Sequence, residues 1–159
     1  MEKIRNGVFE TNSSSTHAIV VDTKTDYKTE IFRQDNEVIE VSGWEYGWEW
    51  ETYNDFHSKL DYMLTMMQYN DSFFEKVQKL IKDETWIEIQ SNFENSDSYV
   101  DHSDESIFSN MSDTELMQYL FNINSYVVTC NDNDEDSPDY ITAKKMDWKK
   151  WYKVFFKWN

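Results

Sequence analysis

The hydrophobic and polar positions of this chain change their period several times, and each change predicts an element. Residues 18–21 and 38–41 are short apolar runs rich in β-branched side chains, which predict buried strands. Residues 85–91 alternate polar side chains with two inward isoleucines, and residues 126–130 form another β-branched run. We therefore expect strands in these four segments, with residues 126–130 in a central position.

Other segments have the period of amphipathic helices. Apolar side chains recur every three or four residues over 52–70, and a second such face follows Asp71. The tight connection between the two predicts an antiparallel helical pair. A third, shorter helix is expected after Ser112, because Glu115 lies three residues later and completes a capping box.

The last segment, residues 143–159, is basic and rich in aromatic residues. Five aromatic side chains fall at i, i+3, i+4, i+7 and i+8 with the lysines off that face, which predicts an amphipathic helix. A basic helix can lie on anionic lipid, but such a surface would repel the acidic remainder of the chain. We therefore expect the helix to dock on the rest of the protein and close the fold. Its apolar face consists of Trp148, Trp151, Tyr152, Phe155 and Phe156.

The order of these elements indicates an α+β fold, with a mostly antiparallel sheet, a helical hairpin and a C-terminal amphipathic helix. A chain of 159 residues can bury one sizeable core, so we expect a single domain over residues 1–159. Three Gly, one Pro and an aromatic content of 17% are typical of a folded protein despite the net charge of -16.

Two polar segments follow neither helical nor strand patterning of the usual kind. Residues 10–17 contain six consecutive hydroxyl or amide side chains, which predict a turn or helix cap. Such a turn can hold an anion, place a nucleophile beside His17, or serve only as a capped connection. Residues 43–51 alternate aromatic residues with acids or glycine, and because the chain has few aliphatic residues we expect their tryptophans to fill the core, with an interface anchor formed by Trp48 or Trp50 as the alternative. These tryptophans, on one face of an extended segment, are Trp44, Trp48 and Trp50.

Charge is distributed very unevenly along the chain. Residues 83–143 contain fifteen carboxylates and no Lys or Arg, and residues 34–58 form a second basic-free stretch with seven more. The net charge is -21 over residues 1–142 and +5 over residues 143–159. Because like charges lower the stability of a compact state, we expect a cationic partner to complete this field. A solvated, solubilising surface is the alternative.

Several classes of protein are disfavoured by what the sequence contains. The single cysteine, Cys130, cannot form an intramolecular disulfide, which indicates a reducing cytoplasm. No apolar run reaches 18 residues and no apolar segment follows the first basic residues, so we expect neither a membrane span nor a signal peptide. Direct nucleic-acid binding would need a basic stripe, and the short tail is the only one.

Candidate chemistry is limited. Asp101, His102, Asp104 and Glu105 and the acidic loop 131–136 have the ligand types of a hard divalent cation, but the Gly and Glu of a calcium loop are replaced by Ser137 and Ala143. No phosphate loop, dinucleotide fingerprint or zinc spacing is present, and we predict no cofactor. The three histidines, His17, His57 and His102, could serve Cys130 as bases, although a lone cysteine in an apolar strand is more typical of a small buried hydrophobe.

Residues 4–17, with the sequence IRNGVFETNSSSTH, resemble the N-terminal signature of a widespread class of small phage and mobile-element proteins. Residues 100–102, and residues 120–126 through 131–133, are similar to later motifs of that class. Within such proteins, this length and acidity resemble a type II anti-CRISPR protein, with a staphylococcal source as the expected one. The resemblance implies an inhibitor of an RNA-guided nuclease.

The sequence thus favours a binding protein rather than an enzyme. We expect it to act in the cytoplasm of a bacterial host by binding a type II CRISPR effector nuclease, alone or with guide RNA, without contacting nucleic acid or membrane. Competition with DNA and locking of a mobile nuclease domain both remain open as mechanisms, and the alternative is a metal-binding enzyme using Asp101, His102 and the loop 131–136. The residues expected to contact the partner are Asp101, Asp104, Glu105, Asp132, Asp134, Glu135, Asp136, Trp48 and Trp50.

Overall fold

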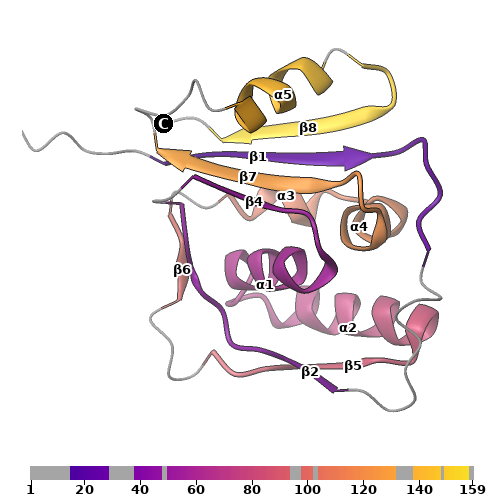
Figure 1. The fold of residues 1–159 in the computed structure, drawn as a ribbon. Helices are drawn as coiled ribbons and strands as arrows, with labels where there is room; N and C mark the ends of the chain where they lie inside the picture. The colour runs from indigo at the N-terminus through magenta and orange to yellow at the C-terminus, as the bar shows by residue number, and fades with distance from the viewer. Residues whose placement is uncertain are drawn as a thin grey trace, which may run out of the picture.

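A computed structural model gives the fold, and its main sheet has four strands in the order β4-β7-β1-β8 (Figure 1). Every neighbouring pair in this sheet is antiparallel, which confirms the predicted α+β class and sheet type. The strands are β1 (Ser15–Asp22), β4 (Glu51–Tyr53), β7 (Tyr126–Asn131) and β8 (Tyr152–Lys157). The structure describes residues 15–28, 38–47, 50–93, 98–101, 104–131, 138–147 and 149–157.

Strands β1 and β7 occupy the centre of the sheet, as their β-branched composition predicts. All eight residues of β1 are buried, because helices cover both faces of the sheet there. Ile19 packs into the larger hydrophobic cluster on one face, whereas Ala18 and Val20 pack into a smaller cluster on the other. The strand begins at Ser15 and includes His17, so the predicted turn over residues 10–17 is wrong for its last three residues; residues 10–14 lie outside the described residues.

The helices form where the apolar periodicity and the capping residues predict them. Asp55 accepts a 2.9 Å hydrogen bond from the Ser58 N–H at the start of the first helix, and Asn70 caps the second in the same way. The predicted capping box of Ser112 and Glu115 is present at the fourth helix. Within the described residues, no helix has the length and apolar character needed to cross a membrane. The helices are α1 (Phe56–Met66), α2 (Asp71–Thr85), α3 (Ser106–Ser109), α4 (Asp113–Phe121) and α5 (Pro138–Met146).

The elements are arranged in layers (Figure 1). Helix α5 lies over one face of the main sheet, α1, α3 and α4 lie under the other, and a small parallel sheet lies beyond α2. Parallel strands need a long crossover, and α1 and α2 provide it between β2 (Val38–Val41) and β5 (Glu88–Ser91). A second parallel pair joins β3 (Glu45–Tyr46) to β6 (Tyr99–Val100). These two parallel pairs were not predicted from the sequence.

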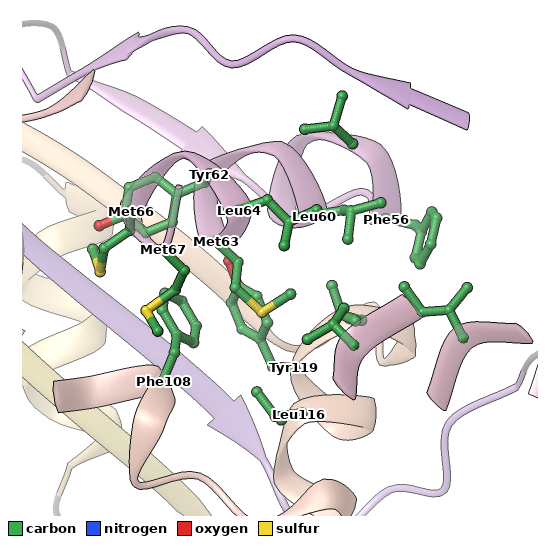
Figure 2. Close-up of a cluster of buried hydrophobic side chains, with 14 of the residues drawn as sticks. Phe56, Leu60, Tyr62, Met63, Leu64, Met66, Met67, Phe108, Leu116 and Tyr119 are labelled. Carbon is green, nitrogen blue, oxygen red and sulfur yellow. The ribbon is translucent and has the colours of Figure 1, made fainter. Parts of the chain in front are cut away.

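The main core lies between the sheet and the helices. Figure 2 shows Met63 of α1 and Met67 at its C-terminal end pointing toward Phe108 of α3 and Tyr119 of α4. All four of these side chains are buried. The methionine-rich face of α1 is therefore core, as its helical spacing predicts.

The predicted C-terminal amphipathic helix is wrong. Residues 152–157 form the edge strand β8, paired with β1 in the register Ile19 opposite Phe155. Tyr152 and Val154 pack on the α5 side of the sheet, whereas Phe155 packs on the larger cluster opposite. Pairing with β1 satisfies one side of the strand's backbone and partly buries Tyr152, Val154 and Phe155, and this outweighs a spacing that fits a helix equally well. The tail does dock on the body, and Lys153 forms an ion pair with Glu115 of α4.

Two further local predictions need correction. Trp44 is 70% exposed and Trp50 is 50% exposed, so these side chains do not fill the core, and Trp48 lies outside the described residues. The strand β3 has only two residues, because Gly43 and Gly47 at positive φ bend the chain on either side of it, and the expected long alternation does not form. Helix α2 also continues through Thr85, so the strand predicted over residues 85–91 begins only at β5.

Candidate functional site

Four of the nine residues expected to bind a partner can be placed. Asp101 follows β6 and is partly buried, whereas Glu105 is exposed at the start of α3. Asp104 accepts a 3.1 Å hydrogen bond from the N–H of Ser106, the first residue of α3. Trp50 is exposed immediately before β4. The other five, Asp132, Asp134, Glu135, Asp136 and Trp48, lie outside the described residues.

The two basic-free stretches of the sequence meet in the fold. Strand β3 belongs to one stretch and β6 to the other, and they pair with Glu45 opposite Tyr99. The Asp101 N–H then donates a 2.9 Å hydrogen bond to the Tyr46 carbonyl. Asp101 is thereby brought next to the aromatic run of residues 43–51, as neither stretch alone could indicate.

Beside this junction lies an open groove of about 380 Å³, which we call the acidic aromatic groove. It is formed by β2 and the chain that follows it, by β4, and by the first turns of α1. Its lining, as far as the structure describes the chain, contains three carboxylates, three large aromatic side chains and the imidazole of His57, and no Lys or Arg. The carboxylates and large aromatic residues are Glu40, Glu51, Asp61, Trp44, Tyr46 and Tyr53. None of the six was among the residues expected to bind a partner, although five of them fall in the basic-free stretch 34–58.

Asp61 of α1 fixes one wall of the groove. Its Oδ1 accepts a 3.1 Å hydrogen bond from the Gly43 N–H, and its Oδ2 accepts a 2.6 Å hydrogen bond from the Tyr46 hydroxyl. Gly43 has a φ of 76°, and a Cβ at this position would overlap the side chain of Ser98. A glycine is therefore required for the turn that holds Trp44 at the groove.

The carboxylates of its lining give the groove a negative electrostatic potential. Burial, followed by the hydrogen bond to Asp61, raises the pKa of Tyr46 well above its usual value, so this hydroxyl remains a donor. Glu51 accepts a hydrogen bond from the Tyr53 hydroxyl, and Glu40 is exposed. Among the described residues, no basic side chain forms an ion pair with Glu40, Glu51 or Asp61. The carboxylates keep acceptor capacity for a cation from outside.

A chain of buried polar groups lies behind this wall. Ser15 Oγ lies 3.0 Å from His17 Nε2, and the Tyr62 hydroxyl lies 2.9 Å from His17 Nδ1. Tyr62 also packs edge-on against Tyr46, with 5.1 Å between ring centroids. Gly47 closes the other side, where an added Cβ would lie 3.0 Å from Ser15 Oγ and 3.1 Å from His17 Nε2.

Ser15 and His17 have the pairing of a nucleophile and a base, which was one interpretation of the Ser-rich segment. However, Ser15 is 1% exposed, His17 is 2% exposed and Tyr62 is fully buried. A substrate therefore has no access to the Ser15 hydroxyl in this conformation. The arrangement instead ties β1 to α1 and supports the groove from behind.

Lys59 is a buried lysine that sequence reasoning did not single out. Its Nζ donates hydrogen bonds of 2.8 Å to the Asn122 carbonyl and 3.1 Å to the Ser125 carbonyl. Burial lowers its pKa to about 7. The sequence feature that could have identified it as buried is its position three residues after Phe56, on the apolar face of α1. Lys59 thus joins α1 to the connection between α4 and β7 and does not neutralise the groove.

The alternative chemistries gain no support from the described residues. Within the parts of the chain that can be described, no three His, Cys, Asp or Glu side chains gather as a metal site, while His102 and the loop 132–136 lie outside them. Cys130 is fully buried and pairs in register with Thr16, on the opposite face of the sheet from His17. His17 is therefore not placed to serve Cys130 as a base.

The groove is thus concave, acidic, aromatic and open to solvent, and its chemistry suits a cationic group. No family model, curated protein or solved structure matches this chain. The chemistry of the groove residues is therefore the guide to function.

Proposed function

We propose that this protein is a binding protein without catalytic activity that inhibits a basic partner by stoichiometric occupancy of its surface. The observation that carries this proposal is the acidic aromatic groove, in which Glu40, Glu51 and Asp61 share a lining that contains no Lys or Arg among the described residues. The net charge of -16 extends the same preference over the whole chain. Such a field attracts a cationic surface and accelerates association with it.

The partner we propose is a type II CRISPR effector nuclease, in the cytoplasm of a bacterial host. Effectors of this kind hold guide RNA and target DNA in positively charged channels, which carboxylates can occupy. The resemblance of residues 4–17 to the signature of small phage proteins supports this choice of partner. Inhibition would follow either from competition with DNA or from locking a mobile nuclease domain.

Binding to the purified effector tests the proposal. The protein is titrated into the effector, with and without guide RNA, and the dissociation constant is measured at several salt concentrations. We expect a one-to-one complex whose affinity falls as salt rises, because exposed charges attract through a medium that ions screen. An unrelated folded protein of equal length and net charge serves as the control. Absence of a complex at low salt, or an equal affinity for the control protein, would contradict the proposal.

A further inference from the structure

We propose that the acidic aromatic groove receives an arginine side chain from the basic partner. This inference rests on the proposed function and adds to it the chemical group that is recognised and the residues that recognise it. The volume of about 380 Å³ falls within the range of about 300–1,000 Å³ that is usual for ligand sites, and an extended side chain can enter because the groove is open.

The lining matches a guanidinium in two respects. Trp44, which lines the groove and is 70% exposed, supplies an indole ring, a group on which a planar cation can stack. Glu40, Glu51 and Asp61 line the same groove and offer carboxylate acceptors for the N–H groups of a cation. Arginine meets both demands with one rigid group, whereas the lysine ammonium is a more strongly hydrated point charge.

The acceptors remain available after the internal hydrogen bonds are counted. Each oxygen of Asp61 accepts one hydrogen bond, from Gly43 and Tyr46, and an ionised carboxylate has about four acceptor positions in all. In Glu51, Oε2 accepts from Tyr53, and Oε1 receives no hydrogen bond from the part of the chain that the structure describes. Because Asp61 is held by the Gly43 backbone, its orientation is fixed before any cation arrives, which lowers the entropy cost of binding.

Titration of the whole protein with N-acetylarginine amide, followed by the NMR signals of the tryptophan indoles, tests the site directly. We expect the Trp44 signal to shift saturably, and the double substitution Glu40→Gln with Glu51→Gln to weaken binding at least fivefold. Both glutamates are exposed, so this variant should fold normally. Asp83→Asn with Glu84→Gln is the matched control, since it makes the same change of net charge on exposed residues that do not line the groove. N-acetyllysine amide should bind more weakly than the arginine compound.

The same variants are then compared in binding to the effector. We expect the groove variant to raise the dissociation constant at least tenfold and the control to leave it nearly unchanged. A Trp44 signal that does not respond to the arginine compound, or an equal loss in the control variant, would overturn the inference. If the groove variant binds the effector as tightly as the wild type, the arginine site is wrong although the proposed function stands. If the wild type binds no effector, the proposed function fails, and the arginine titration still decides whether the groove takes this cation.

Discussion

The hydroxyl of Tyr46 lies 2.6 Å from Asp61 Oδ2, so the strand β3 and the helix α1 are joined at the wall of the groove. Tyr46 in turn packs against Tyr62, whose hydroxyl lies 2.9 Å from His17 Nδ1 inside the sheet. The groove and the buried polar chain are therefore parts of one connected structure. A substitution of His17 in the interior of β1 should therefore alter the wall of the groove.

The first prediction concerns this wall. Asp61→Ala removes the acceptor of both the Gly43 N–H and the Tyr46 hydroxyl, so we expect the free energy of unfolding to fall by about 1–3 kcal/mol. Asp61→Asn keeps an acceptor and the side-chain volume and should lose less. Urea denaturation measures both variants. Equal stability of Asp61→Ala and the wild type would show that Asp61 does not hold the wall.

The second prediction concerns the close approach at Gly47, where φ is 125°. Gly47→Ala places a Cβ 2.9 Å from Asp101 Cβ and 3.0 Å from Ser15 Oγ, and the backbone is strained as well. We expect a loss of about 1–3 kcal/mol in stability. An exposed residue of regular helix, Glu75→Ala, is the comparison and should change stability by less than about 0.5 kcal/mol. Thermal unfolding of the two variants decides the matter, and a melting temperature unchanged in Gly47→Ala would contradict the packing described.

The third prediction concerns pH and Lys59. Its pKa is about 7 in the folded protein and near 10.5 in an unfolded chain, so the unfolded chain binds more protons between these values. The cost of burying the charge is therefore fully present below pH 7, and stability should rise with pH above it, by up to about 1.4 kcal/mol per pH unit. The buried tyrosines, whose pKa values are raised, act against stability only above pH 10.

Urea denaturation of the wild type and of Lys59→Met from pH 7 to pH 9.5 isolates this contribution. The difference in unfolding free energy between the two proteins should change with pH over that interval, because only the wild type carries the titrating amine. A constant difference would mean that Lys59 keeps an ordinary pKa in the folded protein.

The fourth prediction concerns the tail. Truncation after Asp147 removes β8, which leaves the β1 edge unpaired and exposes the apolar side chains that Val154 and Phe155 cover. We expect a protein that aggregates or lacks cooperative unfolding. By contrast, Lys153→Ala, which breaks only the ion pair between an exposed lysine and Glu115, should cost less than about 1 kcal/mol. Circular dichroism during heating compares them, and a truncated protein that melts like the wild type would show that the tail is a free arm.

Sequence patterning was sufficient for the elements whose local signals agree. The capping box at Ser112, the apolar face of α1 and the β-branched run of β7 are each compatible with one type of secondary structure. The tail has two, because Tyr152, Phe155 and Phe156 fit a helix by spacing while Tyr152, Val154 and Phe156 fit a strand by alternation. Pairing with β1, which no local pattern encodes, selects the strand.

The groove could be predicted only in part. Its carboxylates Glu40 and Glu51 belong to a basic-free stretch that the sequence displays plainly. Asp61 lies outside that stretch, on a helix that crosses between two parallel strands, and its contact with Gly43 depends on the positive φ of that glycine. Long-range placement of this kind follows from the topology rather than from spacing along the chain.

The stoichiometry of inhibition distinguishes occupancy of the effector surface from catalytic action on it. A fixed amount of effector charged with guide RNA is mixed with increasing amounts of this protein, at concentrations far above the dissociation constant, and DNA cleavage is measured. We predict that cleavage falls linearly and ends at one molecule of protein per effector, because occupancy of a surface consumes one protein for each site. Complete inhibition at a small fraction of that ratio would indicate catalytic modification, and cleavage unaffected by an excess would remove the effector as the partner; either result would contradict the account.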